Sequence, residues 1–182
     1  ISWDASDSGV GIEVAVRDHG TTVTAGTGVF VHDNEIAGDE VQPERAGINI
    51  LSRAYQAASD ALHTGVTVQD NTVTGAERGI YIVAEARNGG MASVEDLSID
   101  GNTLDGNGDG ISIRDFVNVS GTAAHSNISV TANTVTNSTN PSSGIHVLSN
   151  TSAGGIVVTN NTISGNTGFG ANNEGTGTLD VE

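Results

Sequence analysis

Apolar and polar residues alternate with a period of two along most of the chain, and the alternation returns at regular intervals. In each copy two apolar residues flank one other residue, an Asn follows, an apolar residue comes two places later, and the segment closes on Gly-Ile-x-apolar. Alternation that is rich in Val, Ile and Thr predicts short, half-buried strands. Only residues 51–62 carry a weak helical stripe. The pattern therefore predicts an all-β chain.

Five copies of this pattern are in register. They begin at Val29, Val66, Leu97, Ile128 and Ile156, at spacings of 37, 31, 31 and 28 residues. One copy is too small to bury its own apolar face, so successive copies must stack to form a core. The sequence therefore predicts one solenoid domain of about six coils over residues 1–182.

The string Asn-Thr-Val/Ile/Leu followed by Gly-Ile-x-Val resembles the repeat of the right-handed parallel β-helix family, which includes pectate lyases, alginate epimerases, phage tailspikes and many microbial surface proteins. The resemblance covers almost the whole chain. It implies a right-handed parallel β-helix in a secreted or cell-surface protein, and it leaves the function open because this architecture serves many activities. The first and last residues match only parts of the repeat, so we expect uncapped ends and a section of a longer protein.

The recurrent Asn occupies the position where one strand turns into the next. Asn tolerates the left-handed backbone conformation, and its amide can bond to the like residue one coil away. We therefore expect a structural ladder without a ligand role. Its rungs are Asn34, Asn71, Asn102, Asn133 and Asn161.

Stacking at a strand spacing of about 4.8 Å places equivalent residues in columns. Two inward columns are expected to form the core: Val29, Val66, Leu97, Ile128 and Ile156, and Ile48, Ile80, Ile111, Ile145 and Phe169. The neighbouring outward column is Glu13, Asn49, Tyr81, Ser112, His146 and Gly170. The irregular segments 52–65, 84–95 and 115–127 each follow the Gly-Ile-x-Val strand of one copy, so we expect loops that build a groove beside these strands.

The outward residues are candidates for binding an extracellular polysaccharide. Tyr81 would stack on a sugar ring, Arg114 would pair with a uronate carboxylate, and Glu85 and His146 would complete the surface, with His146 as a base. The chain has neither the cluster of Asp carboxylates that the resemblance to calcium-dependent lyases requires nor the Tyr, His and Asp grouping of the epimerases. The sequence therefore favours a structural or binding domain, such as a rigid stalk or surface scaffold. A fragment of a polysaccharide lyase, hydrolase or epimerase and a self-stacking filament unit remain alternatives.

One segment resembles the first half of a calcium loop. Asp105, Asn107 and Asp109 alternate with glycines, which makes them candidate calcium ligands, although Phe116 stands where the bidentate Glu should fall. The five histidines are scattered without metal-ligand spacing, and no other cofactor is expected.

Charge and composition narrow the partners. The 182 residues include 22 acidic residues, six arginines and no lysine, which gives a net charge of −16. Such a chain repels polyphosphate, so we expect no nucleic acid partner. The absence of Cys excludes a disulfide, a zinc-thiolate site and a thiol nucleophile, and no apolar run reaches the roughly 18 residues that span a membrane. The expected location is extracellular or at the cell surface, with a polysaccharide, flanking coils of the parent protein or the end of a second copy as partners.

Overall fold

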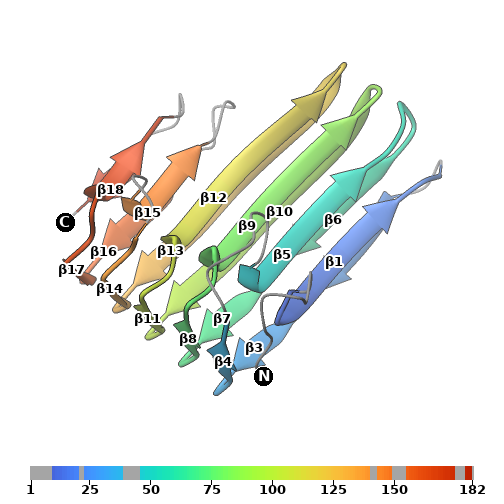
Figure 1. Ribbon diagram of the computed structural model, residues 1–182. Helices are drawn as coiled ribbons and strands as arrows, with labels where there is room; N and C mark the ends of the chain where they lie inside the picture. The colour runs from blue at the N-terminus through green and yellow to red at the C-terminus, as the bar shows by residue number, and fades with distance from the viewer. Residues whose placement is uncertain are drawn as a thin grey trace.

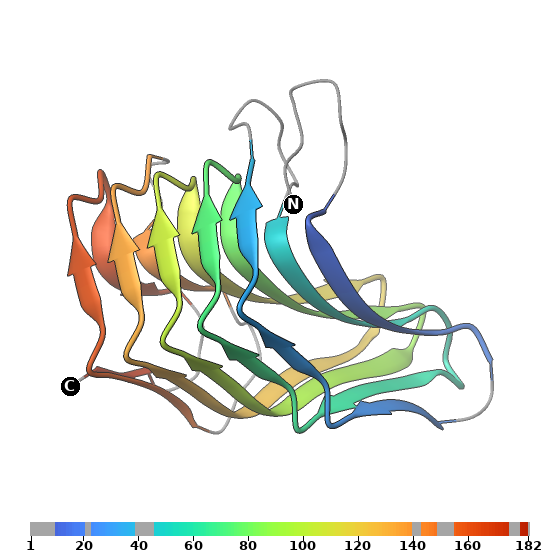
Figure 2. The same ribbon diagram turned by 90° about the horizontal axis from the view of Figure 1, so that it is seen from below.

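The chain forms a parallel β-solenoid. The computed structural model describes residues 10–20, 23–38, 46–139, 143–148, 155–174 and 179–181, which contain 19 strands and no helix. Every pairing between these strands is parallel. Figures 1 and 2 show the successive turns side by side along one axis. The all-β solenoid predicted from the sequence is therefore confirmed.

Three sheets form the walls of the solenoid. The first contains β1 (Ile12–Asp18), β5 (Ala46–Ala54), β9 (Arg78–Arg87), β12 (Asp109–Asn118), β15 (Ser143–Leu148) and β18 (Phe169–Asn173). The second contains β2 (Val23–Thr27), β6 (Asp60–Thr64), β10 (Gly90–Asp100), β13 (Gly121–Thr131), β16 (Ile156–Thr159) and β19 (Leu179–Val181), with β3 (Phe30–His32) and β7 (Thr67–Gln69) beside them. The third contains β4 (Glu35–Ala37), β8 (Thr72–Thr74), β11 (Thr103–Asp105), β14 (Thr134–Thr136) and β17 (Thr162–Ser164).

The number of turns is smaller than the sequence predicted. The third sheet has five strands, so the chain makes four full circuits from β4 to β17. Strands β1 to β3 precede these circuits, and β18 and β19 follow them. The predicted count of about six coils is too high because the outermost copies of the repeat supply only parts of turns.

The predicted inward columns form the main core, with one exception. Ile48, Ile80, Ile111 and Ile145 are fully buried in register on β5, β9, β12 and β15. On the second sheet Val66, Leu97, Ile128 and Ile156 are buried, and Val29 packs against them at the first turn.

Phe169 is the exception, because the last turn is shifted by two residues from the predicted alignment. Phe169 pairs with Ser143 and is 65% exposed, whereas Ala171 pairs with Ile145 and packs against the core. The same shift places Asn172, and not Gly170, beside His146 in the outward column. A shift of two residues keeps each side chain on its face of the sheet, so alternation alone does not fix this register.

Most residues of the segments predicted as loops lie in strands. Residues 84–87 and 90–95 continue β9 and β10, and residues 115–118 and 121–127 continue β12 and β13, so the first and second sheets lie against each other beyond the main core (Figure 2). A second, small-residue core fills this extension, formed by Val16, Ala54, Ala61, Ala84, Ala86, Ala92 and Ala123. His63 and His125 are also buried there, and His125 Nδ1 contacts Asp115 Oδ1.

The corner before the third sheet uses the left-handed backbone, but not at the Asn that the sequence indicated. The residue before each of these asparagines has a positive φ: Asp33, Asp70, Gly101, Ala132 and Asn160, with φ of 53°, 53°, 65°, 54° and 57°. The Asn itself is thereby turned inward, where its amide faces the next turn.

Candidate ligand-binding groove

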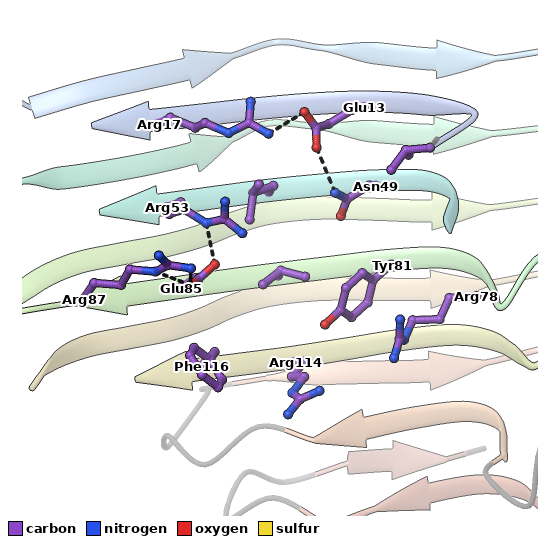
Figure 3. A pocket seen from close by; sticks show the side chains of 13 residues that line it. Glu13, Arg17, Asn49, Arg53, Arg78, Tyr81, Glu85, Arg87, Arg114 and Phe116 are labelled. Atoms are coloured by element: carbon purple, nitrogen blue, oxygen red, sulfur yellow. Dashed lines mark hydrogen bonds and ion pairs between the residues drawn. The ribbon is translucent and has the colours of Figure 1, made fainter. Parts of the chain in front are cut away.

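A groove of about 460 Å³ crosses the outer face of the first sheet (Figure 3). Its lining comes from β1, β5, β9 and β12, together with Val10 two residues before β1: Val10, Glu13, Arg17, Asn49, Leu51, Arg53, Arg78, Tyr81, Val83, Glu85, Arg87, Arg114 and Phe116. Apart from Val10 and Arg78, these are outward positions, whose neighbours along each strand face the core. The groove therefore lies on the sheet itself, without the wall of loops that the sequence predicted.

Three of the four candidate carbohydrate-binding residues line this groove. Tyr81 and Glu85 lie on β9, and Arg114 lies on the adjacent strand β12 as the partner of Val83. Tyr81 and Arg114 are thus on neighbouring turns of one face, two residues apart in register. Parallel pairing of equivalent repeat positions brings them together.

His146 lies outside the lining of the groove. It follows Tyr81 and Ser112 in the same column, on β15, and is only 6% exposed. Its Nδ1 is 3.9 Å from Asp109 Oδ2, and its Nε2 is 3.5 Å from Glu174 Oε1. The carboxylate of Asp109 holds the pKa of His146 above its ordinary value, although burial opposes this shift.

Arginines dominate the polar part of the lining. Five of the six arginines of the chain lie here: Arg17, Arg53, Arg78, Arg87 and Arg114. Sequence reasoning named Arg114 as a candidate and did not single out the other four. Arg87 lies within residues 84–95, for which the sequence predicts a loop, Arg17 lies near the end of β1, and Arg78 lies before the corner at Gly79. The sequence signal that could have identified them is that the chain has only six positively charged side chains, all of them arginines.

Three of these arginines form ion pairs inside the groove. Arg17 pairs with Glu13, and Glu85 binds Arg53 through Oε2 and Arg87 through Oε1. Glu85 is 5% exposed, so its two partners neutralise a buried carboxylate. The ring of Tyr55 also lies near both cations, 5.9 Å from the Arg53 guanidinium carbon and 5.4 Å from that of Arg87.

Arg78 and Arg114 differ from the other three. Among the described residues neither has a carboxylate within ion-pair distance. Each lies by an aromatic ring instead, with Arg78 4.6 Å above the centroid of Tyr81 and Arg114 5.9 Å from that of Phe116. These contacts position the guanidinium groups but leave their hydrogen-bond donors available.

A second hollow of about 300 Å³ continues from the groove. Arg114 and Phe116 line both hollows, and Asp115, Val117, Leu148 and Glu174 complete the second. It lies beside the end of β15, where Leu148 pairs with Arg114 of β12.

The three candidate calcium ligands point to different partners. The Asp105 carboxylate accepts bonds from Thr136 Oγ1 (2.6 Å) and Asn137 Nδ2 (2.7 Å), which lower its pKa. Asn107 is buried, and its Oδ1 accepts a bond from the Ala76 amide (2.9 Å). Asp109 lies by His146. Within the described residues, no group of three or more His, Asp or Glu side chains is arranged to hold a metal ion.

The five asparagines of the ladder are hydrogen-bonded from turn to turn. Nδ2 of Asn34, Asn71, Asn102 and Asn133 each donates to Oδ1 of the Asn one turn later, at 2.9, 2.9, 2.9 and 3.0 Å. The same Oδ1 atoms accept the backbone N–H of the preceding rung at 2.9–3.1 Å. Asn107 and Asn166 perform a similar role at a second corner, which sequence reasoning missed. These side chains are occupied by the backbone, as a structural role requires.

Comparison of the chain with protein-family models, with curated proteins and with solved structures finds no match. In the part of the chain that the structure describes, no helix is long and apolar enough to cross a membrane. Strand pairing and side-chain geometry therefore carry the functional argument.

Proposed function

We propose that this chain is a section of a right-handed β-helix from a secreted or cell-surface protein, related to the pectate-lyase-like solenoids, and that it binds an extracellular polysaccharide along its first sheet. The groove on β1, β5, β9 and β12 carries the proposal, because it crosses four adjacent strands and is lined by two aromatic rings beside many hydrogen-bond donors. Sugar rings are recognised by stacking on aromatic side chains and by hydrogen bonds to their hydroxyls. The stacked turns would hold this surface rigid.

The ion pairs favour binding over cleavage. Both carboxylates in the lining, Glu13 and Glu85, are paired with arginines. A general base must be free to accept a proton at the reacting centre. His146, the other candidate base, is buried next to the groove and lies by Asp109 and Glu174. We therefore propose a scaffold that holds a glycan, with a lyase, hydrolase or epimerase fragment as the alternative.

Binding of a panel of soluble polysaccharides tests this function. Alginate, polygalacturonate, xylan and dextran would be compared by affinity electrophoresis and titration calorimetry, with the products checked for depolymerisation. We expect saturable binding of at least one glycan without turnover, and a several-fold loss of affinity in Tyr81→Ala, because a stacking contact contributes about 1 kcal/mol.

Phe30→Ala is the matched control. Phe30 is an aromatic residue that is 56% exposed on β3 of the second sheet, outside the groove lining. Absence of binding to every glycan, or an equal loss in both variants, would contradict the proposed site. Depolymerisation that Tyr81→Ala abolishes would establish the enzyme alternative.

A further inference from the structure

The extension of the first and second sheets ends in an open edge. Among the described strands, the pairing of β15 with β12 stops at Arg114, and the pairing of β16 with β13 begins at Ile128 (Figure 1). The extended turn has thirteen residues between these two positions (115–127), whereas the next turn has seven (149–155). One residue spans at most about 3.3–3.6 Å, so the next turn is too short to follow β12 and β13 to their tip.

This edge lacks the residues that normally protect one. Exposed strand edges of natural proteins carry charges or prolines that discourage pairing with another chain. Residues 116–127 contain no Asp, Glu, Lys, Arg or Pro, although the chain has a net charge of −16. The equivalent residues one turn earlier, 85–96, include four charged side chains: Glu85, Arg87, Glu95 and Asp96. Charge is therefore absent from the one extended turn whose edge is open.

Apolar residues replace small or polar ones in the same turn. Val117 occupies the position of Ala86 and is 45% exposed, whereas Ala86 is fully buried. Val119 is 85% exposed and has a φ of 73°, which is unfavourable for a β-branched residue. One turn earlier the corner has Asn88, with a φ of 49°. Exposed apolar side chains and a strained backbone both point to a contact with another chain.

The second hollow lies at the base of this edge. It has a volume of about 300 Å³, and its apolar lining consists of Phe116, Val117 and Leu148. When two identical edges lie antiparallel, the tip of one is placed against the base of the other. Val119 at the tip would then meet an apolar hollow on the second copy.

We propose that two copies of the chain pair through this edge about a two-fold axis, with Val119 of each copy in the hollow of the other. The edges of β12 and β13 would run antiparallel to the same edges of the second copy, which extends both sheets. This contact goes beyond the proposed glycan binding and does not depend on it. It also differs from end-to-end stacking, because a two-fold contact occupies both edges and closes at the dimer.

Charge favours a second copy as the occupant. Two chains with a net charge of −16 repel each other, so their closest approach is favoured where the surface lacks carboxylates. Residues 116–127 form such a surface, and symmetry matches two identical edges in length and apolar content. An edge without charges offers no ion pair to a strongly acidic or basic partner.

The test measures association of the chain with itself. Sedimentation equilibrium between about 1 and 200 μM would compare the wild type with Val117→Ala, Val119→Asn and Ser126→Glu. Each variant copies the residue found one turn earlier, so the fold of the turn should be retained. Val157→Ser is the matched control, because it copies Ser129 and removes a valine that is 40% exposed on β16, away from the edge. Thermal unfolding of each variant separates lost association from lost structure.

We expect a wild-type dimer whose population rises with concentration and with added salt, which screens the repulsion between the copies. Val117→Ala and Val119→Asn should each weaken dimerisation by about tenfold or more, because each change is made in both copies. Val119→Asn should not lower the unfolding midpoint, because Asn accepts the left-handed conformation. Ser126→Glu should weaken the dimer more at low salt than at high salt, and Val157→Ser should change its dissociation constant by less than about threefold.

Hydrogen exchange at low and high concentration locates the contact. The backbone amides of residues 121–127 should gain protection as the dimer forms, because the edge of β13 becomes paired. A wild type that stays monomeric at every concentration would overturn the proposal, and so would species that grow beyond the dimer. Equal weakening by Val157→Ser and Val119→Asn, or unchanged exchange of residues 121–127 in the dimer, would overturn the assignment to this edge.

Discussion

Replacing Asn102 with Ala removes the middle rung of the Asn ladder from a site that is 0% exposed. Its Oδ1 accepts bonds from the backbone N–H of Asn71 at 3.0 Å and from Asn71 Nδ2 at 2.9 Å. Its Nδ2 donates to the Val68 carbonyl at 3.0 Å. Alanine replaces none of these bonds, so the buried N–H of Asn71 loses its acceptor and the Val68 carbonyl loses one donor.

The magnitude follows from the groups left unpaired. A buried donor or acceptor without a partner costs about 1–3 kcal/mol. Because Asn71 Nδ2 still donates to the carbonyls of Val31 and Gln69, its backbone N–H carries most of the loss. We expect Asn102→Ala to lower the free energy of unfolding by about 1–3 kcal/mol.

Asn34→Ala is the matched comparison at the first rung. Its Nδ2 donates to Asn71 Oδ1 at 2.9 Å, but that oxygen keeps the bond from the Asn34 backbone N–H at 3.1 Å. We expect a loss below about 1 kcal/mol there, and a change within about 0.5 kcal/mol for the exposed Thr103→Ala. Urea unfolding followed by circular dichroism measures all three. Equal losses in Asn34→Ala and Asn102→Ala, or no loss in the latter, would refute the argument.

Three further predictions test the core, a corner and the extension. Ile111→Asp should abolish the cooperative thermal transition, because Ile111 is 0% exposed among aliphatic side chains; a transition near the wild-type midpoint would contradict this. Gly110→Ala should lower the free energy of unfolding in urea by about 1–3 kcal/mol, because the new Cβ would lie 2.2 Å from Val135 Cγ1. Gly170→Ala should be close to neutral, because the nearest atom to its new Cβ would lie at 3.7 Å. Similar losses of stability in the two variants would argue against close packing at Gly110. Burial lowers the pKa of His63, so the unfolded chain binds a proton more readily and the free energy of unfolding should fall as the pH drops below about 6.5. His63→Leu should reduce this pH dependence, and an unchanged dependence between pH 7.5 and 5 would assign it to other groups.

The repeat predicts most of the fold because equivalent residues of successive copies become strand partners. Aligning the Gly-Ile-x-Val segments gives the observed pairs of Ile48 with Ile80 and of Ile80 with Ile111. The alignment fails at the last turn, where Gly168 and Gly170 both fit the glycine position. The observed register places Ala171 in the core and leaves Phe169 outside.

The extension was less predictable because its core consists of small residues. Ala84 and Ala86 alternate with Glu85 and Arg87, but alanine is a weak strand signal, so the sequence predicts a loop at residues 84–95. That error also hid Arg87 from the candidate site. Only the pairing of whole turns shows that this arginine joins Arg53 at Glu85.

Asn107 shows how one local pattern can have two origins. Oxygen-bearing side chains at alternate positions between glycines describe the start of a calcium loop, and they also describe a tight corner whose Asn bonds to the backbone of the previous turn. The sequence does not separate these alternatives, because the deciding partner, Ala76, lies 31 residues earlier.

The ladder also makes the length of the molecule adjustable in fixed steps. Each rung bonds to the rung 31 residues later in the central turns, and the incoming and outgoing bonds of Asn71 and Asn102 are the same. Duplication of one such unit in the gene would insert a turn whose amides meet identical partners above and below. The solenoid would lengthen by about 4.8 Å per duplication, while the contacts at its two ends would remain as they were.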